Sequence, residues 1–232
     1  MRLDKFLSHT GHGTRKEVKI LIKEKRIKVN NEIIKDPSLI INEEKDTITI
    51  DDEIIEYQKY QYFILFKPKG YITATEDSYL PIVMDLIQEP YKNLSPVGRL
   101  DKDTTGLLLI TNNGKLNHFL LAPSTHVDKE YYVTLDKPLS LSLIEEFKNG
   151  IVLEDGYKCL PAKMEIVDDY HALLTIHEGK YHQVKRMFLA LGYLVTDLHR
   201  TRMDILTLEG LNIGEYRPLT KEEITLLSKN MK

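Results

Sequence analysis

One stretch of the 232-residue chain reads Gly98-Arg99-Leu100-Asp101-Lys102-Asp103-Thr104-Thr105-Gly106-Leu107-Leu108-Leu109. It predicts a turn that bears an arginine and two aspartates and that runs directly into an apolar strand. A strand anchors such a turn rigidly, which is how protein scaffolds hold reactive groups in place. Three interpretations of Asp101 and Asp103 are open: they decorate a turn, they bind a metal ion, or one is a catalytic carboxylate flanked by cations.

Metal and disulfide chemistry find little support in the sequence. A metal site needs more hard ligands than Asp101 and Asp103 supply, so no metal is predicted. The single cysteine, Cys159, excludes an internal disulfide framework and a multi-cysteine zinc site. The longest apolar runs, such as residues 106–110, are too short to cross a bilayer, and residues 1–4 do not begin a signal peptide. We therefore expect a cytoplasmic protein without a membrane partner.

Apolar runs on both sides of this stretch predict an α+β domain. Helices are expected at residues 142–149, where Ser142 and Glu145 predict a capping box before Gly150, and at residues 182–191. Because strands and helices alternate without regular βαβ spacing, we expect a mixed sheet. The strands are predicted at residues 62–66, 106–111, 130–135, 172–176 and 205–208.

Charge is distributed unevenly along the first quarter of the chain. The whole protein has a formal net charge of −3, which by itself argues against a nucleic-acid partner. Residues 1–35, however, hold ten basic and four acidic residues, whereas residues 36–56 hold one basic and eight acidic residues. A cationic surface for RNA is therefore compatible with the nearly neutral total.

A helix in the cationic segment carries its charge on one face. Thr14 and Glu17 predict a capping box that begins a helix ending near Arg26. At 100° per residue its cations share one arc, whereas Val18 and Ile22 face another side. Since the arc contains no acid, we predict that it binds RNA; a merely solvated face is the alternative. The arc consists of Arg15, Lys16, Lys19, Lys23 and Arg26, and two further cations, Arg2 and Lys5, flank an earlier apolar stripe.

Residues 1–55 resemble the S4-like RNA-binding domain, in which two helices pack against a small sheet. The likeness rests on Arg2-Leu3-Asp4-Lys5-Phe6-Leu7 and on Ile27-Lys28-Val29-Asn30. Asn31 stands where that domain usually has a glycine in the following turn, and asparagine tolerates left-handed conformations. The resemblance implies that the basic helix contacts structured RNA.

From residue 62 to residue 218 the chain resembles the pseudouridine synthases that modify ribosomal RNA. The resemblance implies a mixed, mainly antiparallel sheet and a division into an S4-like domain (1–56), a linker (57–61) and a catalytic domain (62–232). Four motifs carry it in the family's order: Lys67-Pro68-Lys69-Gly70, the stretch from Gly98 to Leu108, Lys129-Glu130-Tyr131, and Glu178-Gly179-Lys180-Tyr181-His182-Gln183-Val184-Lys185-Arg186-Met187-Phe188.

The resemblance also implies roles for single residues. In this family the aspartate after Arg-Leu is essential, which assigns catalysis to Asp101. Tyr131 is implied to pack against the target base, and Lys185 to meet the catalytic carboxylate, with Arg186 as the alternative cation. Arg99 is expected to fill the gap that a flipped base leaves. Further contacts with the RNA are expected from Lys129, His182 and Arg186.

The implied activity is isomerisation of uridine to pseudouridine. This reaction exchanges no electrons and loses no atoms, so no cofactor is expected. Asp101 either attacks the anomeric carbon or removes a ribose proton, and the sequence does not separate these routes. The last motif and residues 214–219 are most similar to a branch of the family that modifies 16S rRNA, whose implied target is uridine 516. A monomer acting on 16S rRNA in a ribonucleoprotein intermediate is expected.

Three alternatives stay open. A sister branch of the family acts on 23S rRNA, and a non-catalytic rRNA-binding or assembly protein would use the N-terminal module alone. A hydrolase would use Asp101 and Asp103 as an acid–base pair. Because they are two residues apart at the entry of one strand, their carboxylates are expected to point to different sides, which argues against a hydrolase.

Overall fold

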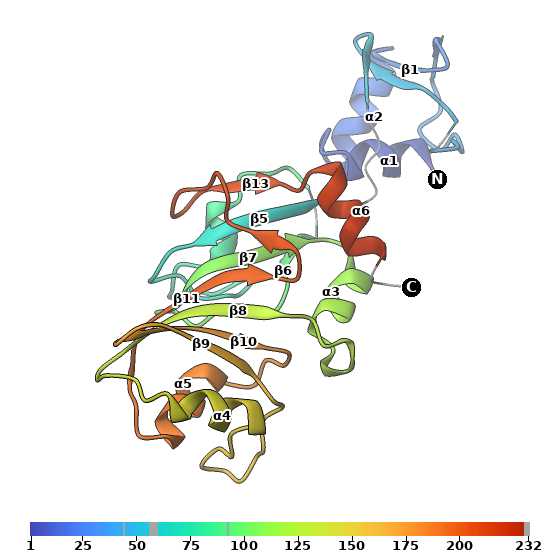
Figure 1. The fold of residues 1–232 in the computed structure, drawn as a ribbon. Helices are drawn as coiled ribbons and strands as arrows, with labels where there is room; N and C mark the ends of the chain where they lie inside the picture. Colours follow the sequence, from blue (N-terminus) through green and yellow to red (C-terminus); the bar gives the residue numbers. More distant parts are fainter. Residues whose placement is uncertain (44, 56–59, 92, 230–232) are drawn as a thin grey trace. The chain divides into compact units, whose positions relative to one another are not determined.

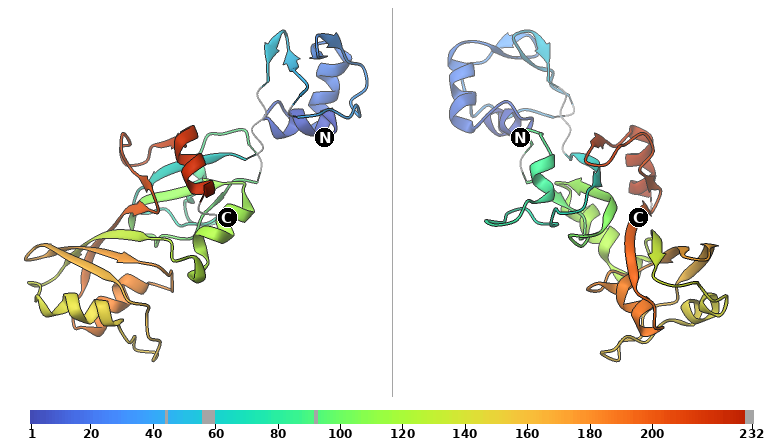
Figure 2. Two further views of the ribbon diagram at one scale, coloured as in Figure 1. Left: turned by 45° about the vertical axis from the view of Figure 1, so that its right-hand side comes forward. Right: turned by 90° about the vertical axis from the view of Figure 1, so that its left-hand side faces the viewer.

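The computed structural model describes residues 1–43, 45–55, 60–91 and 93–229, which divide into two units (Figures 1 and 2). The units are Met1–Gln61 with Gln88–Leu94, and Tyr62–Ile87 with Ser95–Lys232. Residues 88–94 were expected in the catalytic domain, but they cluster with the N-terminal unit because Pro90 packs at Gly11, where a Cβ would lie 2.7 Å from its ring. The linker predicted at 57–61 falls mostly on residues 56–59, outside the described residues.

The N-terminal unit packs two helices against a four-stranded antiparallel sheet. Apolar stripes of both helices meet the buried face of the sheet, and Leu3, Phe6, Val18, Ile22 and Ile27 are at most 2% exposed. The elements are α1 (Leu3–His9), α2 (Arg15–Lys23), β1 (Ile27–Val29), β2 (Glu32–Ile33), β3 (Ile48–Ile50) and β4 (Glu53–Ile54), with the strand order β2-β1-β3-β4.

The capping box predicted for α2 is confirmed. Thr14 N donates to Glu17 Oε2 (2.6 Å), and Glu17 N donates to Thr14 Oγ1 (3.4 Å). The helix ends before Arg26, however, so the prediction that Arg26 belongs to the helical arc is wrong. Lys25 takes a positive φ of 63°, which breaks the helix, and Arg26 Nη2 donates to Asp51 Oδ2 (2.6 Å).

β1 and β2 form a hairpin that turns at Asn30 and Asn31. Both residues take positive φ angles, 52° and 70°, and Val29 pairs with Glu32 across the turn. Asn30 Oδ1 also accepts a hydrogen bond from Thr47 N (2.9 Å), which ties the turn to the segment before β3. Asparagine therefore supplies here the left-handed conformation for which glycine is usual.

The C-terminal unit is built on a nine-stranded sheet with the order β13-β5-β7-β11-β8-β10-β9, in which β6 also pairs with β7 and β12 with β11 (Figure 1). β7 and β11 run parallel, and the other paired strands run antiparallel. The predicted α+β class with a mixed, mainly antiparallel sheet is confirmed. The strands are β5 (Tyr62–Lys67), β6 (Ser95–Pro96), β7 (Thr105–Thr111), β8 (Lys129–Leu135), β9 (Lys163–Asp168), β10 (His171–Ile176), β11 (Val195–Met203), β12 (Leu206–Thr207) and β13 (Tyr216–Pro218).

The strand predicted at 205–208 corresponds to β12, but the longer strand before it was missed. The long strand in this region is β11, which lies between β7 and β8, whereas β12 has only two residues and folds back on β11. The β11 sequence is largely polar, and its pairing with β8 contains two register shifts. A polar strand with interrupted alternation gives neither an apolar run nor a regular period-2 pattern, so periodicity did not reveal it.

Helices flank the sheet. α4 and α5 pack against each other through Phe147 and Phe188, whose ring centroids are 4.8 Å apart, beside the β9–β10 end of the sheet (Figure 1). No described helix is long and apolar enough to span a bilayer. The helices are η1 (Val83–Leu86), α3 (Gly114–Leu121), η2 (Pro123–Thr125), α4 (Ser142–Asn149), α5 (Gln183–Ala190) and α6 (Lys221–Lys229).

The helices predicted at 142–149 and 182–191 are confirmed as α4 and α5, but the cap of α4 is not the predicted one. Ser142 is the first helical residue, and the N-cap is Leu141, which has no side-chain acceptor. The capping box at Ser142 and Glu145 is therefore wrong. Gly150 ends α4 as predicted, with a φ of 80° that favours glycine.

Candidate active site

Asp101 lies in a tight turn directly before β7, here called the Asp101 turn (residues 101–104). Thr104 N donates to Asp101 O (3.1 Å) and closes the turn. Gly106, the second residue of β7, has a φ of 115°, and a Cβ at this position would lie 2.3 Å from the Arg200 carbonyl oxygen. Glycine is thus required for the close parallel approach of β7 and β11, and this approach fixes where the turn emerges from the sheet.

A buried ammonium group holds the Asp101 turn from inside the protein. Lys67, the last residue of β5, is 0% exposed, and its Nζ donates to the carbonyl oxygens of Thr104 (2.8 Å), Asp101 (2.9 Å) and Pro68 (3.0 Å). Burial lowers the pKa of Lys67 to about 8, although the charges of Asp101 and Asp103 oppose the shift. The three acceptors match the three donors of a protonated lysine.

The segment after β5 supports the turn further. The Thr73 hydroxyl donates to Leu100 O (2.7 Å) and accepts from Leu100 N (3.0 Å). Gly70 N donates to Lys102 O (2.8 Å). The backbone on both sides of Asp101 is therefore fixed by residues 67–73, which is the preorganisation that a reactive side chain requires.

The Asp101 carboxylate contacts two side chains at the beginning of α5. Lys185 Nζ lies 3.0 Å from Asp101 Oδ2, and His182 Nε2 lies 3.5 Å from Asp101 Oδ1. The Asp101 side chain is 27% exposed, so it is accessible to a substrate but only partly screened by water. His182 is the N-cap of the helix and Lys185 lies in its first turn, where the helix dipole also favours an anion.

Lys185 contacts a second carboxylate as well. Its Nζ donates to Asp103 Oδ1 (2.6 Å). Burial acts to lower the pKa of Lys185, but the hydrogen bonds to Asp103 and Asp101 outweigh it and raise this pKa above its ordinary value. For Asp103, burial acts to raise the pKa, but several opposing interactions, above all the hydrogen bond and the charge of Lys185, together lower it. Lys185 therefore stays protonated at neutral pH.

The expectation that Asp101 and Asp103 point to different sides is wrong, because both carboxylates contact the same Lys185 nitrogen. Their arrangement still does not suit a hydrolase. An acid–base pair needs one carboxyl whose pKa is raised, so that it holds a proton to donate. The pKa of Asp103 is lowered instead, and its side chain is 72% exposed.

Tyr131 lies on β8 and is 8% exposed. In the sheet register it pairs with Arg200 of β11, which pairs in turn with Gly106 of β7.

Lys129, on the same strand as Tyr131, was predicted to contact RNA, but it is 4% exposed and its Nζ donates to Val127 O (3.1 Å). Burial, with a smaller effect of Arg200, lowers the pKa of Lys129 to about 8. The structure places Lys129 in the core, which corrects the prediction.

Arg200 is a further buried cation and, like Lys67, lies near the turn, at 2% exposure. Its Nε donates to Leu107 O (2.7 Å), and its charge contributes to the lowered pKa of both Lys67 and Lys129. Within the described part of the chain, Arg200 Nη2 and Thr104 Oγ1 are buried without a hydrogen-bond partner. The interior around the Asp101 turn is therefore positively charged.

Two further site residues were predicted in this unit, Arg99 and Arg186. Arg99 is exposed, two residues before Asp101. Arg186 binds Glu154 (2.7 Å) and Asp155 (2.6 Å) instead of Asp101. Lys185, and not the alternative Arg186, is thus the cation that contacts the carboxylate of the Asp101 turn.

In the N-terminal unit the predicted RNA-binding cations fall into two groups. Arg2 pairs with the buried carboxylate of Asp4 (2.8 Å), and Arg26 pairs with Asp51 (2.6 Å). The others are exposed and have no ion pair with another described residue: Lys5, Arg15, Lys16, Lys19 and Lys23. Four of these five lie on α2.

Three residues that hold the site were not among those predicted from the sequence: Lys67, Thr73 and Arg200. The signal for Lys67 was present: a lysine directly follows the apolar run Tyr62-Phe63-Ile64-Leu65-Phe66, at a position that the strand buries. Thr73 and Arg200 gave no such signal, because their partners are backbone atoms about 30 and 90 residues away.

The arrangement presents one accessible carboxylate whose position is fixed and whose charge is balanced by Lys185. Such a group serves as a nucleophile or as a general base. The described residues contain no group of three or more His, Cys, Asp or Glu side chains arranged to hold a metal ion.

Comparison with known proteins places this site in a family. Residues 61–190 match the family model for RNA pseudouridylate synthase, and residues 1–48 match the S4 domain. The chain is 42% identical to the ribosomal small subunit pseudouridine synthase A of Haemophilus influenzae, over 99% of this chain and 100% of that protein. It is also 42% identical to an uncharacterized RNA pseudouridine synthase of Bacillus subtilis, over 99% of each chain.

A solved structure, described as the crystal structure of pseudouridylate synthase, is 42% identical in sequence. It superposes with a TM-score of 0.69 and covers 98% of this chain and 99% of that chain. The Asp101 turn, Tyr131 and Lys185 all lie within the residues that match the family model. The chain therefore belongs to the RNA pseudouridine synthases and carries an S4 domain at its N-terminus.

Proposed function

We propose that this pseudouridine synthase modifies 16S rRNA and that Asp101 is its catalytic carboxylate. The observation that carries the proposal is the contact between Lys185 Nζ and Asp101 Oδ2 (3.0 Å), on a turn whose backbone is bound by the buried Lys67. A carboxylate that a flipped base covers loses water, and a fixed cation keeps it ionised. Membership of the enzyme family argues against the alternative of a non-catalytic rRNA-binding protein.

In the proposed reaction the bond between the ribose C1′ and the uracil N1 breaks, the base turns, and C1′ bonds to C5. The proton on C5 leaves and N1 gains one, so the product is an isomer of the substrate and no redox step occurs. Asp101 begins this sequence by attacking C1′ or by removing the adjacent ribose proton. Both routes require the ionised carboxylate that Lys185 stabilises.

The target uridine has to leave its stack, since Asp101 acts on atoms that are covered in a helix. We propose that Tyr131 packs against the flipped base and that the Arg99 side chain fills the space that the base leaves in the RNA. Arg99 is exposed and lies two residues before Asp101 in the chain, which is compatible with this role. His182 is a further contact to the nucleotide, since it lies beside the carboxylate.

Support for 16S rRNA comes from the relatives named for the small ribosomal subunit. Besides the Haemophilus influenzae protein, that of Escherichia coli is 39% identical over 97% of this chain and 98% of its own length. The equally similar Bacillus subtilis protein carries no subunit in its name. The proposed target within 16S rRNA is uridine 516, presented in a ribonucleoprotein intermediate.

The proposal is tested with rRNA from a strain in which this gene is deleted. Purified chain is incubated with 16S rRNA, 23S rRNA and small-subunit particles, and pseudouridine is mapped by carbodiimide treatment and primer extension. We expect one new stop, at uridine 516 of 16S rRNA, and none with Asp101→Asn. Modification of 23S rRNA alone would contradict the proposal and move the chain to a sister branch of the family.

A further inference from the structure

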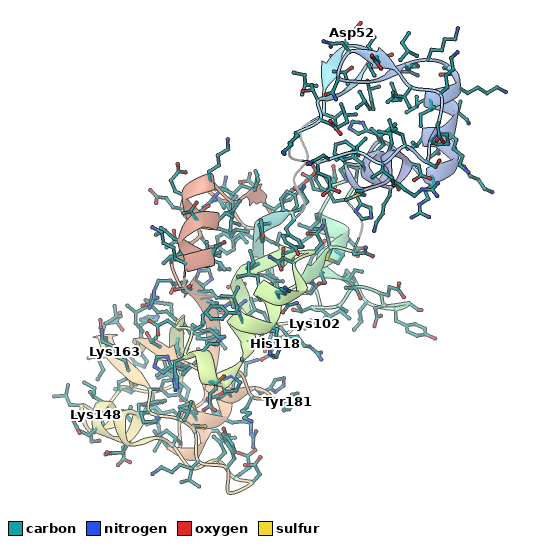
Figure 3. The ribbon with its side chains drawn as sticks, turned by 90° about the vertical axis from the view of Figure 1, so that its right-hand side faces the viewer. Asp52, Lys102, His118, Lys148, Lys163 and Tyr181 are labelled. Carbon is teal, nitrogen blue, oxygen red and sulfur yellow. The ribbon has the colours of Figure 1, made fainter. Side chains whose placement is uncertain are left out.

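Tyr181 is an exposed aromatic residue beside the contacts of Asp101, and the roles assigned above do not include it. It is 75% exposed, and its ring stacks on that of His182, with centroids 3.9 Å apart and planes inclined by 17°. His182 Nε2 lies 3.5 Å from Asp101 Oδ1. His182 therefore contacts both the Tyr181 ring and the Asp101 carboxylate, and Figure 3 shows the Tyr181 side chain pointing away from the ribbon.

Exposure alone does not single out Tyr181, since Tyr79 is 94% exposed. What distinguishes Tyr181 is the buried polar network beneath its loop. Gln183, 3% exposed, accepts from Lys180 N (2.9 Å) and donates to Glu178 Oε1 (2.8 Å). Glu178, 1% exposed, also accepts from the Tyr157 hydroxyl (2.7 Å). Satisfied networks of this kind hold a loop in one conformation.

The backbone at Tyr181 is held on its other side as well. Arg186, itself fixed by Glu154 and Asp155, donates to Tyr181 O (3.4 Å). His182 adopts a left-handed conformation with a φ of 47°, which is uncommon for a residue with a side chain. Such strain persists only where the surroundings fix it, and it is frequent at functional sites. The ring pair is therefore a positioned feature and not a loose side chain.

We propose that the outer face of the Tyr181 ring stacks on the base of a nucleotide next to the target uridine. Its inner face is covered by His182, so one face is open. Unpaired RNA bases are recognised largely by stacking on aromatic side chains. Because Tyr181 stacks on His182, and His182 is the residue that contacts Asp101, we assign the base on Tyr181 to a neighbour of the reacting nucleotide and not to that nucleotide. This inference rests on the proposed role of Asp101.

The absence of tryptophan from the sequence permits a direct measurement. Tyr181→Trp in an Asp101→Asn background gives a single indole in a protein that binds RNA without converting it. The probe is the rRNA that the wild-type chain modifies in the mapping assay. We expect this RNA to quench the emission and to protect the indole from acrylamide. The matched control is Tyr170→Trp in the same background, at a 44% exposed tyrosine in the turn between β9 and β10, where emission should not change.

Kinetics provide the second readout. Tyr181→Ala should raise the RNA concentration that half-saturates single-turnover conversion roughly tenfold, as expected for one lost base–aromatic stack. The rate at saturation should stay within about twofold, because a neighbouring base contributes binding and not chemistry. Tyr181→Phe should behave as the wild type, and so should Tyr170→Ala.

Several results would overturn this inference. One is an unchanged half-saturating concentration for Tyr181→Ala; another is unchanged Tyr181→Trp emission at RNA concentrations where filter binding shows a complex. A collapse of the saturating rate with unaltered half-saturation would instead assign Tyr181 to the target base. The proposed function fails separately, because modification of the wrong rRNA or activity in Asp101→Asn appears in the mapping assay whatever the indole reports.

Discussion

Lys185 Nζ lies 3.0 Å from Asp101 Oδ2, whereas the backbone carbonyl of the same aspartate accepts a hydrogen bond from Lys67 (2.9 Å). The charge of the carboxylate is thus balanced by one lysine on α5, and its position is fixed by another at the end of β5. Since these lysines belong to different elements, substitutions should separate the two effects.

Asp101→Asn should abolish pseudouridine formation, with a loss of roughly a thousandfold or more in single-turnover rate. The amide keeps the shape of the side chain but neither attacks C1′ nor accepts a proton. Asp103→Asn is the matched control, because Asp103 contacts the same lysine yet is 72% exposed; its rate should fall by less than about tenfold. RNA affinity, measured by filter binding, should be unchanged in both variants. If Asp103→Asn is inactive and Asp101→Asn is active, the assignment is reversed.

Lys185→Met should cut activity severely at neutral pH. The variant leaves Asp101 and Asp103 close together without their shared cation, and such carboxylates protonate more readily. The acidic limb of the single-turnover pH profile should therefore move to higher pH. Lys185→Arg should retain more activity, because it preserves the charge but not the geometry.

Arg186→Met is the control for this experiment, because Arg186 binds Glu154 and Asp155 and not Asp101. It should weaken RNA binding, since it removes the donor to Tyr181 O, without displacing the acidic limb. A wild-type pH profile for Lys185→Met together with a displaced limb for Arg186→Met would show that Arg186 is the functional cation.

The parts of the fold that the sequence predicted are those that local patterns determine. The capping box of α2, the turn at Asn30 and Asn31, and the strand that follows the Asp101 turn depend on residues close together in the chain. The end of α2 was missed, since only the left-handed Lys25 and the pairing of Arg26 with Asp51 show that the helix stops.

The sequence likewise predicted some residues of the candidate site and not others. The motifs identified Asp101 and Lys185, which the fold brings together from positions far apart in the chain. Arg200 could not be assigned, since its partner is a carbonyl group that it meets only after β7 and β11 pair. For Lys67 the sequence indicated burial after an apolar strand, but its carbonyl partners in the Asp101 turn come near only after β5 and β7 pair. Lys129 was assigned to the RNA from its place in the motif Lys129-Glu130-Tyr131, whereas in the structure it lies buried on β8.

Lys67→Met should lower the free energy of unfolding by roughly 2 kcal/mol or more, because it leaves three carbonyl acceptors without their donor. Because the Asp101 turn is then no longer held by Lys67, the single-turnover rate should also fall, although the Asp101 side chain is intact. Urea denaturation measures the first effect and single-turnover kinetics the second. Lys69→Met is the control, because Lys69 is half-exposed and pairs with the exposed Asp197 (2.7 Å). Full stability and activity of Lys67→Met would show that the turn does not depend on the buried ammonium.

Lys129→Met should change how stability depends on pH. Burial lowers the pKa of Lys129 to about 8, whereas in the unfolded chain a lysine titrates near 10.4. Between these values the unfolded chain binds more protons, so the free energy of unfolding of the wild type rises with pH. The variant should show a smaller rise between about pH 8 and 10, and at pH 7 it should lose little stability, since it removes a buried charge. Urea denaturation at several pH values measures both; a rise equal to that of the wild type would mean that Lys129 is not buried in solution.

The exposed cations of α2 should supply affinity for RNA without affecting chemistry. Lys16, Lys19 and Lys23 are exposed and have no ion pair with a described residue, whereas Arg26 pairs with Asp51. A triple variant of these lysines to alanine should weaken rRNA binding and reduce the slope of log affinity against log salt by about 2, since each lost phosphate contact contributes about 0.7–0.9. Arg26→Ala, the control, should change the slope little, and saturating single-turnover rates should match the wild type in both. An unaltered salt slope in the triple variant would mean that this face of α2 is solvated and that the S4 domain binds RNA elsewhere.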